Sequence, residues 1–370
     1  MRAGRQTSML AEMVRSPTPP RDALVFLAAA VAVWVTGAWL APNGWWHRWA
    51  AAAVAAAMIP HARDGLRWWR ATKWAWAVGA LLAWQLASLL WSDGGGWWML
   101  LDAAGVLAVV TALGLVAGRP DWRRALIPVM VWVALFSALL ALVVFYLLHG
   151  RSLGGERLRL PWIHGDGLNA VLTGLLCAAG AVAALGEGAR GRDRFDRVVC
   201  LAAAGCCVFA VLATRSRGAL LALLAGAIVL AWFERRRLVA GLLAAGCAAG
   251  VYFVILFSGG GEAAALLERG AAGRMDIYLW FLGRMGGMEW IAGAGAGTAA
   301  VIAEDQLGWF VEHPHSAYLT QLYLTGGIGL VLLLVVLGGA AWRGLREAAP
   351  ADAVWLALLA TGAMGVLFDT

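Results

Sequence analysis

The chain has 370 residues, of which 62% are hydrophobic and only 14% are charged, and its mean hydropathy is +0.75. Soluble domains carry roughly 25% charged residues, so this composition excludes a water-soluble enzyme. The net charge of +7 does not indicate a nucleic acid partner, because the Lys and Arg residues gather in short connections on one predicted side of a membrane. Membrane lipids are the expected surroundings.

The apolar residues fall into eleven blocks, most of them long enough to cross a hydrocarbon core of about 30 Å as a helix. The blocks lack the alternating polar residues of membrane strands, and a bilayer does not hydrate unpaired backbone groups, so helices are predicted. The expected fold is all-α, a polytopic transmembrane bundle of about 11 spans. The blocks cover residues 23–41, 45–60, 74–92, 97–118, 125–148, 167–186, 198–214, 218–233, 238–257, 316–342 and 353–368.

Charge decides the predicted orientation. Threading the chain alternately across the membrane places most of the 29 Lys and Arg residues on one side, which the positive-inside rule makes cytoplasmic. Residues 1–21 are then a cytoplasmic tail, and residues 22–257 contain the first nine helices. Residues 258–315 form one long external loop, and residues 316–370 contain the last two helices. A loop of this length is the expected place for function.

Arginines are scarce on the predicted external side, and two of them, Arg215 and Arg217, lie in the turn Thr214-Arg-Ser-Arg-Gly218 between two predicted spans. An unpaired guanidinium at that depth is costly, so an anionic partner is one explanation. Snorkelling of both side chains to the lipid headgroups is the other.

The long loop contains a segment, residues 273–284, whose apolar positions have helical spacing. These positions are Met275, Tyr278, Leu279 and Leu282. The pattern predicts an amphipathic helix lying on the outer surface, with Arg274 in its first turn. There Arg274 could help the helix N-terminus to hold phosphate oxygens. A salt bridge to Glu268 or Asp276 is the alternative.

The sequence Glu312-His-Pro-His-Ser316 immediately precedes the tenth block. Pro314 restricts the backbone, so His315 is predicted to open the helix near the membrane surface. Because histidine accepts a proton near neutral pH, His315 is a candidate general base. His313 and His315 could also bind a metal ion together with Glu312. This site is less favoured, because the i, i+2 spacing of the histidines is awkward on a helix and no third ligand at a metal-site spacing appears. An interfacial histidine with only a structural role is also open.

The loop also contains Gly293-Ala-Gly-Ala-Gly297, which lacks the strand and helix context of a dinucleotide site and predicts a close-packed turn. The chain has no Asp-x-Asp motif, which disfavours glycosyltransferases that hold their leaving group through a metal ion. No metal and no cofactor are expected.

Four segments taken together resemble the O-antigen ligase and O-antigen polymerase superfamily of polytopic membrane enzymes. The first is similar to a Ser-Arg-Gly element, the second to an Arg-x(5)-Trp and Gly-x-Gly loop, and the third to a closing His-Ser-x-x-Leu and Gly-x-x-Gly signature. The fourth is a weaker match to an Asn-containing helix start. In this order the segments are Thr214 to Leu221, Arg274 to Gly297, His315 to Gly329, and Gly167 to Ala170. The resemblance covers roughly residues 165–342.

This resemblance implies an enzyme of the bacterial inner membrane with its active site facing the periplasm. It would move a glycan from undecaprenyl pyrophosphate to the lipid A core, without a metal and with inversion at the anomeric carbon. His315 would remove the acceptor proton, and Arg217 and Arg274, helped by Arg215, would hold the donor pyrophosphate. The supporting residues would be His313, Ser316 and Trp280. Family members commonly have twelve spans, so a further helix is expected after Thr370.

Other functions stay open. An O-antigen polymerase or a protein O-oligosaccharyltransferase would use the same kind of donor with a different acceptor. The single moderate loop and the lack of a large external domain favour a ligase over protein glycosylation. A transporter or a flippase for lipid-linked glycans is the alternative from another class, with Arg215 and Arg217 along the substrate path. The sequence shows neither the related halves nor the mid-span charges of many transporters. A structural scaffold is the third alternative.

Overall fold

The computed structural model describes residues 52, 54–56, 58–94, 98–117, 120–151, 157–159, 170–190, 194–234, 272–299, 311, 313–347 and 353–367. Apart from a bridge residue at Val311, the regular secondary structure of these residues is helical, which confirms the predicted all-α class. The predicted tail 1–21 and the predicted blocks 23–41 and 238–257 lie outside the described residues.

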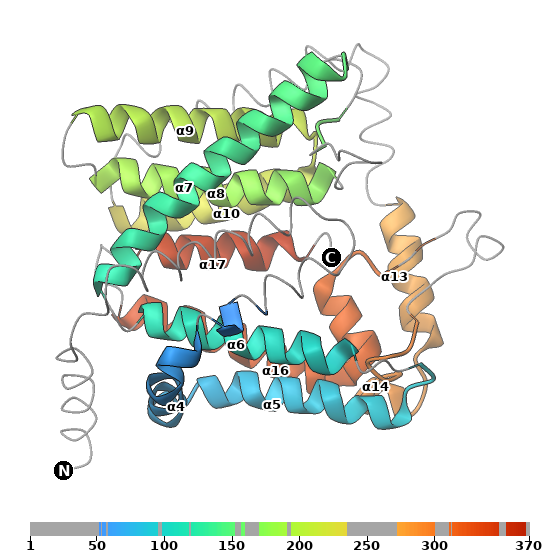
Figure 1. The fold of residues 1–370 in the computed structure, drawn as a ribbon. Helices are drawn as coiled ribbons and strands as arrows, with labels where there is room; N and C mark the ends of the chain where they lie inside the picture. Colours follow the sequence, from blue (N-terminus) through green and yellow to red (C-terminus); the bar gives the residue numbers. More distant parts are fainter. Residues whose placement is uncertain are drawn as a thin grey trace.

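Figure 1 labels most of the described helices in chain order. Their bounds are η1 (Ile59–His61), α4 (Ala62–Ala71), α5 (Ala75–Ala87), η2 (Ser88–Trp91), α6 (Trp98–Ala117), α7 (Pro120–Leu142), η3 (Val143–Leu148), α8 (Ala170–Arg190), α9 (Arg194–Ala213), α10 (Arg217–Glu234), α13 (Ala272–Arg284), α14 (Glu289–Ala292), α16 (Ala317–Glu347) and α17 (Ala353–Gly365). Each described block of the sequence from 74 onward overlaps one of the α-helices, and the blocks 74–92 and 125–148 continue into η2 and η3.

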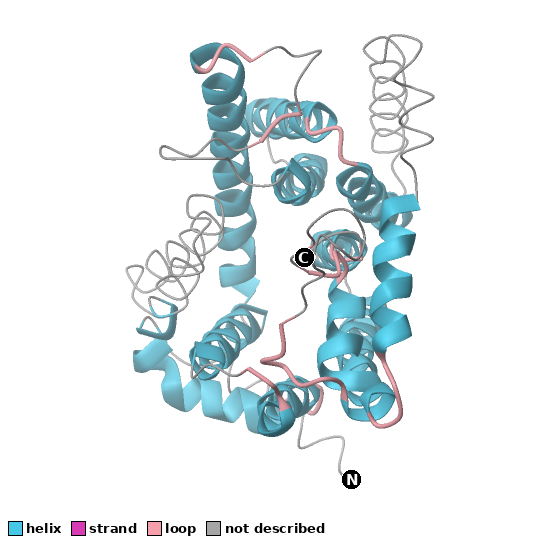
Figure 2. Ribbon diagram, turned by 90° about the vertical axis from the view of Figure 1, so that its right-hand side faces the viewer, coloured by secondary structure: helices cyan, strands magenta, loops and turns pink. Residues whose placement is uncertain are grey.

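Five helices are long and apolar enough to cross a membrane: α6, α7 with η3, α8, α9 and α16. The pair formed by η1–α4 and α5–η2 passes the same test only when taken together, and it is bent by 98°. Two shorter apolar helices, α10 and α17, pack against this set. The described part of the chain therefore contains five or six candidate spans by length and composition. Figure 2 views several helices nearly end-on, as expected for a bundle of spans.

Small residues allow the central helices to pack closely. An added Cβ at Gly180 of α8 would come within 2.2 Å of Ala134 on α7, and one at Gly186 would come within 2.1 Å of Val354 on α17. Close packing of this kind drives helix association in lipid, where burying apolar side chains gains little. Cys177 and Cys207 lie buried among these helices as free thiols and act as small core residues.

The segment 61–73, which the sequence predicts as a connection between spans, instead forms the ten-residue helix α4. Its charged residues exclude it from an apolar block, but they do not prevent a helix that lies across the end of the bundle. Trp68 of α4 is buried against α6, where it occupies the space beside Gly114. The predicted connection between the second and third blocks is therefore largely helical.

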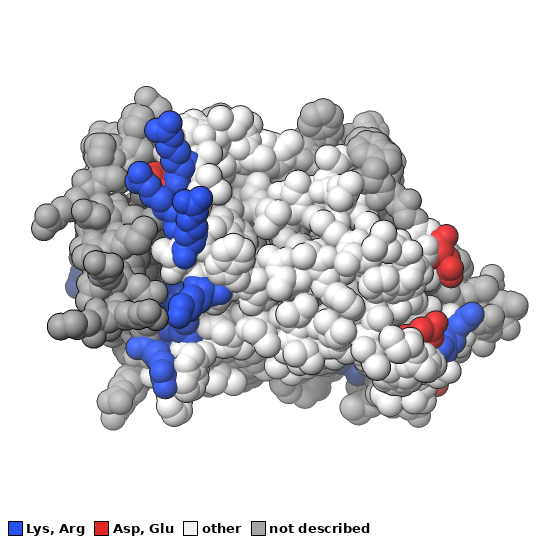
Figure 3. All heavy atoms as spheres, turned by 90° about the horizontal axis from the view of Figure 1, so that it is seen from below, with Lys and Arg blue, Asp and Glu red and all other residues white. Residues whose placement is uncertain are grey.

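The two ends of the bundle carry different elements (Figure 1). At one end, called here the α4 end, lie α4, the C-terminal ends of α8 and α16 and the N-terminal end of α9. At the other, the α13 end, lie α13, α14 and the N-terminal ends of α10 and α16. Figure 3 shows Lys and Arg side chains in a band at the α4 end. The described connections predicted to be cytoplasmic therefore share one end of the molecule.

Candidate functional site

The turn between α9 and α10 holds two of the predicted arginines. Arg215 is half-buried with a left-handed backbone at φ 50°, and Arg217 is exposed as the first residue of α10. Thr214 is fully buried, and its Oγ1 donates a hydrogen bond of 2.6 Å to the carbonyl of Val211. The Ser216 hydroxyl accepts a hydrogen bond from the backbone N–H of Ala219 at 3.2 Å, which caps α10.

A segment from far along the chain covers this turn. The Nε of Arg157 donates a hydrogen bond of 2.9 Å to the carbonyl of Thr214. The neighbouring Leu158 is fully buried, and its N–H donates to the carbonyl of Ala213 at 2.9 Å. Arg157 therefore holds its guanidinium beside the arginine turn. Sequence analysis missed this residue as part of the site; the only signal was its place among the few arginines on the predicted external side.

The histidine turn precedes α16. The His313 and His315 rings lie with their centroids 4.2 Å apart, and Pro314 between them is fully buried. His315 has φ 54°, and α16 begins two residues later at Ala317. The prediction that His315 opens the helix was therefore wrong: its left-handed backbone places it before the helix, and the carbonyl of buried Ser316 starts the helical hydrogen bonds.

The start of α16 is held by the end of α17. The N–H of Ala317 donates to the carbonyl of Val366 at 2.8 Å, and the hydroxyl of Tyr318 donates to the carbonyl of Ala363 at 3.0 Å. The first bond pairs a free N–H in the first turn of α16 with a carbonyl just beyond the end of α17. The second ties the Tyr318 side chain to the last turn of α17. The position of the histidine turn therefore depends on α17.

The arginine turn and the histidine turn share one unusual feature. Among the described residues, Arg215 and His315 are the two residues other than glycine with positive φ. Each stands directly before a buried serine at the start of a helix, Ser216 or Ser316. A left-handed backbone costs a residue with a Cβ about 1–2 kcal/mol, and such conformations cluster at functional sites where the surroundings enforce them. The strained positions coincide with two residues predicted from their chemistry.

Arg274 lies half-buried in the first turn of α13, as predicted. The residues of this helix that are most deeply buried in the protein, however, lie outside the predicted apolar stripe. Ile277 and Phe281 pack into a cluster with Val311 and Leu319. Two members of the predicted apolar stripe, Met275 and Leu279, are exposed by 49% and 59%. The sequence pattern supports both faces, and packing against the start of α16 selects one of them.

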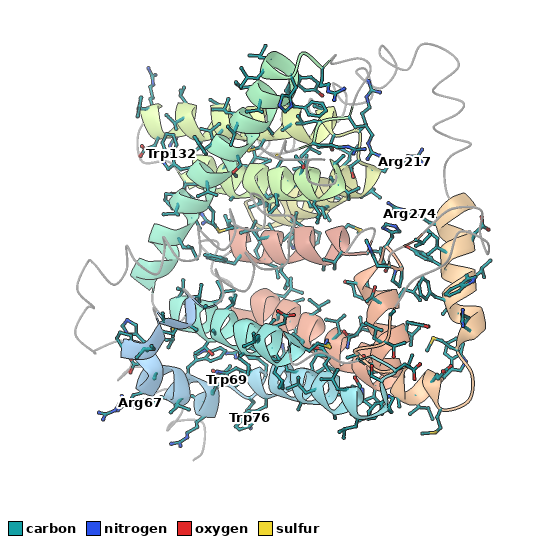
Figure 4. All side chains as sticks on the ribbon, turned by 45° about the vertical axis from the view of Figure 1, so that its right-hand side comes forward. Arg67, Trp69, Trp76, Trp132, Arg217 and Arg274 are labelled. Carbon is teal, nitrogen blue, oxygen red and sulfur yellow. The ribbon has the colours of Figure 1, made fainter. Side chains whose placement is uncertain are left out.

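Trp280 stacks at the edge of the Phe281 ring with centroids 4.9 Å apart, and the Arg284 guanidinium lies over the Trp280 ring at 4.7 Å. Trp280 therefore packs against two other side chains of α13. In Figure 4, Arg217 and Arg274 both lie at the α13 end, whereas Arg67 lies at the opposite end. The start of α16, with the histidine turn, is at the α13 end as well (Figure 1).

The glycine loop, Gly293-Ala-Gly-Ala-Gly297, packs into a break in α16. At Gly326 the backbone of α16 leaves the helical conformation, with φ 68° and ψ −171°. The carbonyls released there accept hydrogen bonds of 2.9 Å, from Ala294 N–H to Tyr323 and from Gly295 N–H to Leu324. An added Cβ at Gly326 would come within 2.2 Å of a carbonyl oxygen of α14. The prediction of a close-packed turn is confirmed.

Two further side chains bind this joint, one at the break in α16 and the other at the glycine loop. The indole Nε1 of Trp84 on α5 donates to the carbonyl of Thr325 at 2.8 Å, and the Ser88 hydroxyl accepts from the N–H of Ala296 at 3.0 Å. The loop thus ties α5, α14 and α16 together at the α13 end. Among the residues that the structure describes, no group of three His, Cys, Asp or Glu side chains could hold a metal ion.

Comparison with known proteins matches this part of the chain to a family. Residues 202–334 match the family model described as O-antigen ligase. This stretch of 133 of the 370 residues is similar to an O-antigen ligase family domain. The domain begins inside α9 and ends inside α16, so it includes the arginine turn, α13, the glycine loop and the histidine turn. The predicted resemblance to the O-antigen ligase superfamily is therefore confirmed over this range. No curated protein matches the chain.

Proposed function

We propose that the chain is an O-antigen ligase that moves a glycan from undecaprenyl pyrophosphate to the lipid A core at the periplasmic face of the bacterial inner membrane. The main support is the coincidence of two strained turns, at Arg215 and His315, at one end of a helical bundle and inside the O-antigen ligase family domain. Membership of that family indicates a membrane glycan transferase that uses lipid-linked glycans. The choice of ligase, and the chemistry below, belong to the proposal.

The arginines would hold the donor. When the glycan leaves, negative charge builds up on the lipid pyrophosphate, and a fixed cation lowers the energy of that transition state. Arg217 and Arg274 have planar guanidinium groups that bind phosphate oxygens through paired hydrogen bonds and stay charged at neutral pH. Arg215, two residues before Arg217, would help them. Arg157 would hold the turn through its hydrogen bond to the carbonyl of Thr214.

His315 would act on the acceptor. Its imidazole takes the proton from an acceptor hydroxyl as the oxygen forms a bond to the anomeric carbon. The bond from that carbon to the pyrophosphate oxygen breaks, and its electron pair leaves with undecaprenyl pyrophosphate. This single displacement inverts the anomeric configuration and needs no metal ion. The His313 ring, 4.2 Å from His315 between centroids, would keep the base in position.

The first prediction tests both roles. We expect His315→Ala to lower the transfer rate about 10²- to 10⁴-fold, because a general base contributes that much. Arg217→Ala should lower it about 10²- to 10³-fold, because it removes a charge aimed at the leaving group. Transfer is measured in membranes supplied with lipid-linked donor and lipid A core acceptor.

Arg194→Ala, which removes an exposed arginine at the α4 end, is the matched control and should retain full activity. All three variants should insert to the same level in membranes. Full activity in either site variant would contradict the proposed mechanism. Loss of transfer on adding EDTA, reversed by a divalent ion, would contradict the metal-independent chemistry.

One observation favours the transporter alternative. Many transporters use broken helices, and α16 is broken at Gly326. The carbonyls at this break are bound by the glycine loop and Trp84, however, so the break serves as a packing joint in this structure. Sealed vesicles containing the purified protein separate the two functions, because a transporter moves the lipid-linked glycan without forming a glycosidic bond.

A further inference from the structure

The helix α4 has a direction that the proposed transferase function does not explain. It is bent by 98° from the pair formed by α5 and η2. Residues 75–91 alone span roughly 25 Å at 1.5 Å per residue, which is close to the thickness of a hydrocarbon core. If these residues cross the membrane, α4 runs parallel to its surface. The charges on α4 agree, because several basic side chains inside the hydrocarbon would be costly.

One face of α4 is fixed to the bundle. Gly65 lies so close to α6 that an added Cβ would be 2.9 Å from the side chain of Thr111. The Trp69 indole donates a hydrogen bond of 2.8 Å to the Thr111 hydroxyl, and buried Trp68 fills the space beside Gly114. These contacts hold the helix in one orientation on α6.

The opposite face of α4 presents a row of cations. Arg63, Arg67 and Arg70 are all exposed, and their spacing of four and three residues puts them on one side of a helix. Lys73, just beyond the helix, is exposed as well. Asp64 offsets part of this charge, since its carboxylate lies 3.8 Å from an Arg67 nitrogen. Four basic side chains therefore stand against one carboxylate.

The end of α16 adds further positive charge at the α4 end. Arg346 is exposed and lies over the Trp342 ring at 4.0 Å, and Arg343 lies one turn before it. In Figure 3 the Lys and Arg side chains at this end form a band across the molecule. A tryptophan beside an arginine at a helix end is typical of the headgroup layer, where both side chains find favourable surroundings.

We propose that the outer face of α4, formed by Arg63, Arg67, Arg70 and Lys73, binds the headgroups of anionic phospholipids. Each basic side chain near an anionic surface contributes about 1 kcal/mol of attraction, and guanidinium groups also form paired hydrogen bonds with phosphate. The right-angle bend lays all four side chains along the membrane surface. This inference is independent of the transferase function, because it concerns the opposite end of the molecule.

Native mass spectrometry of the full-length protein, titrated in a neutral detergent with phosphatidylglycerol or phosphatidylcholine, tests the proposal. We expect tighter binding of phosphatidylglycerol to the wild type, and about 30-fold weaker binding to Arg63→Gln/Arg70→Gln, from two lost charges. These two positions avoid Arg67, so Asp64 keeps its partner. Arg63→Lys/Arg70→Lys should retain most of the preference, because it keeps both charges.

The matched control is Arg151→Gln/Arg159→Gln, which removes two exposed arginines from the α13 end and should change phosphatidylglycerol binding less than about twofold. Equal loss in both double variants would overturn the proposal, as would wild-type binding by Arg63→Gln/Arg70→Gln. The wild type alone provides a further test: its preference for phosphatidylglycerol should fall in high salt, which screens exposed charges. A preference unaffected by salt would also contradict it.

Discussion

At the scale of single residues, Arg215 combines a proposed role of its side chain with an unfavourable backbone conformation. Its side chain is proposed to hold phosphate, while its φ of 50° is a local cost of the turn. Thr214 and the covering segment at Arg157 and Leu158 enforce that conformation through their hydrogen bonds. A substitution can therefore remove the chemistry and relieve the strain at once, or remove the chemistry alone.

The second prediction uses this difference. Arg215→Gly should be more stable than Arg215→Ala by about 1 kcal/mol, because only alanine keeps a Cβ in the left-handed region. Both variants should show the same reduction in glycan transfer, since both lack the guanidinium. Thermal unfolding in detergent measures the stability, and the membrane assay measures transfer. An alanine variant as stable as the glycine variant would contradict the strained turn.

The sequence identifies the candidate site residues more readily than it identifies the residues that contact them. Arg215, Arg217, Arg274 and His315 stand out in the sequence because arginines are scarce on the predicted external side and histidines are few. Arg157 did not stand out, since its contact with Thr214 joins residues 57 apart. Long-range contacts of this kind have no periodic signal in the chain.

At the scale of helices, α16 shows how one glycine sets the course of a span. The sequence predicts a single span over residues 316–342, and the structure has one helix interrupted at Gly326. The interruption lets the carbonyls of Tyr323 and Leu324 bind the glycine loop. The Gly326-Gly327 pair is compatible with a straight helix in lipid, so the sequence pattern could not distinguish the two.

The third prediction concerns this joint. Gly326→Ala should lower the free energy of unfolding by at least about 2 kcal/mol, because the new Cβ meets backbone and the residue has φ 68°. Gly338→Ala on the same helix is the control, since nothing lies within 4 Å of its added Cβ. That variant should differ from the wild type by less than about 1 kcal/mol, with no loss of stability. Equal stability of both variants in thermal unfolding would contradict the packed break.

The helix α13 makes the same point for an amphipathic segment. Its existence and its first turn follow from the sequence, but the buried residues are Ile277 and Phe281. Apolar residues occur on more than one side of this helix, so periodicity does not select a face. The neighbouring start of α16, through Leu319, makes that selection.

At the scale of the whole molecule, the separation of charge between the two ends predicts the orientation in the membrane. The α4 end carries the basic band, and the positive-inside rule makes this end cytoplasmic (Figure 3). The arginine turn, the histidine turn and α13 would then face the periplasm. That orientation is what an enzyme using donors and acceptors on the periplasmic face requires.

The fourth prediction tests the orientation with single cysteines in a background whose five native cysteines have been replaced. Gly286→Cys lies at an exposed position at the α13 end, with open space around its Cβ. A membrane-impermeant maleimide should label it in intact spheroplasts. Lys73→Cys at the α4 end should react only after permeabilisation. The reverse labelling pattern would place the proposed active site in the cytoplasm and contradict the ligase function.

The amino-acid sequence alone determined the all-α class, the apolar blocks, their charge asymmetry and the resemblance to the O-antigen ligase family, because each of these depends on composition, local pattern or short motifs. Only the tertiary structure decided which face of α13 is buried, where α16 breaks and that His315 stands before its helix. It also brought Arg157 to the arginine turn and laid α4 across the bundle. These features depend on contacts between residues distant in the chain, and in lipid such contacts are decided by the close fit of small residues and backbone hydrogen bonds, which hydropathy does not record.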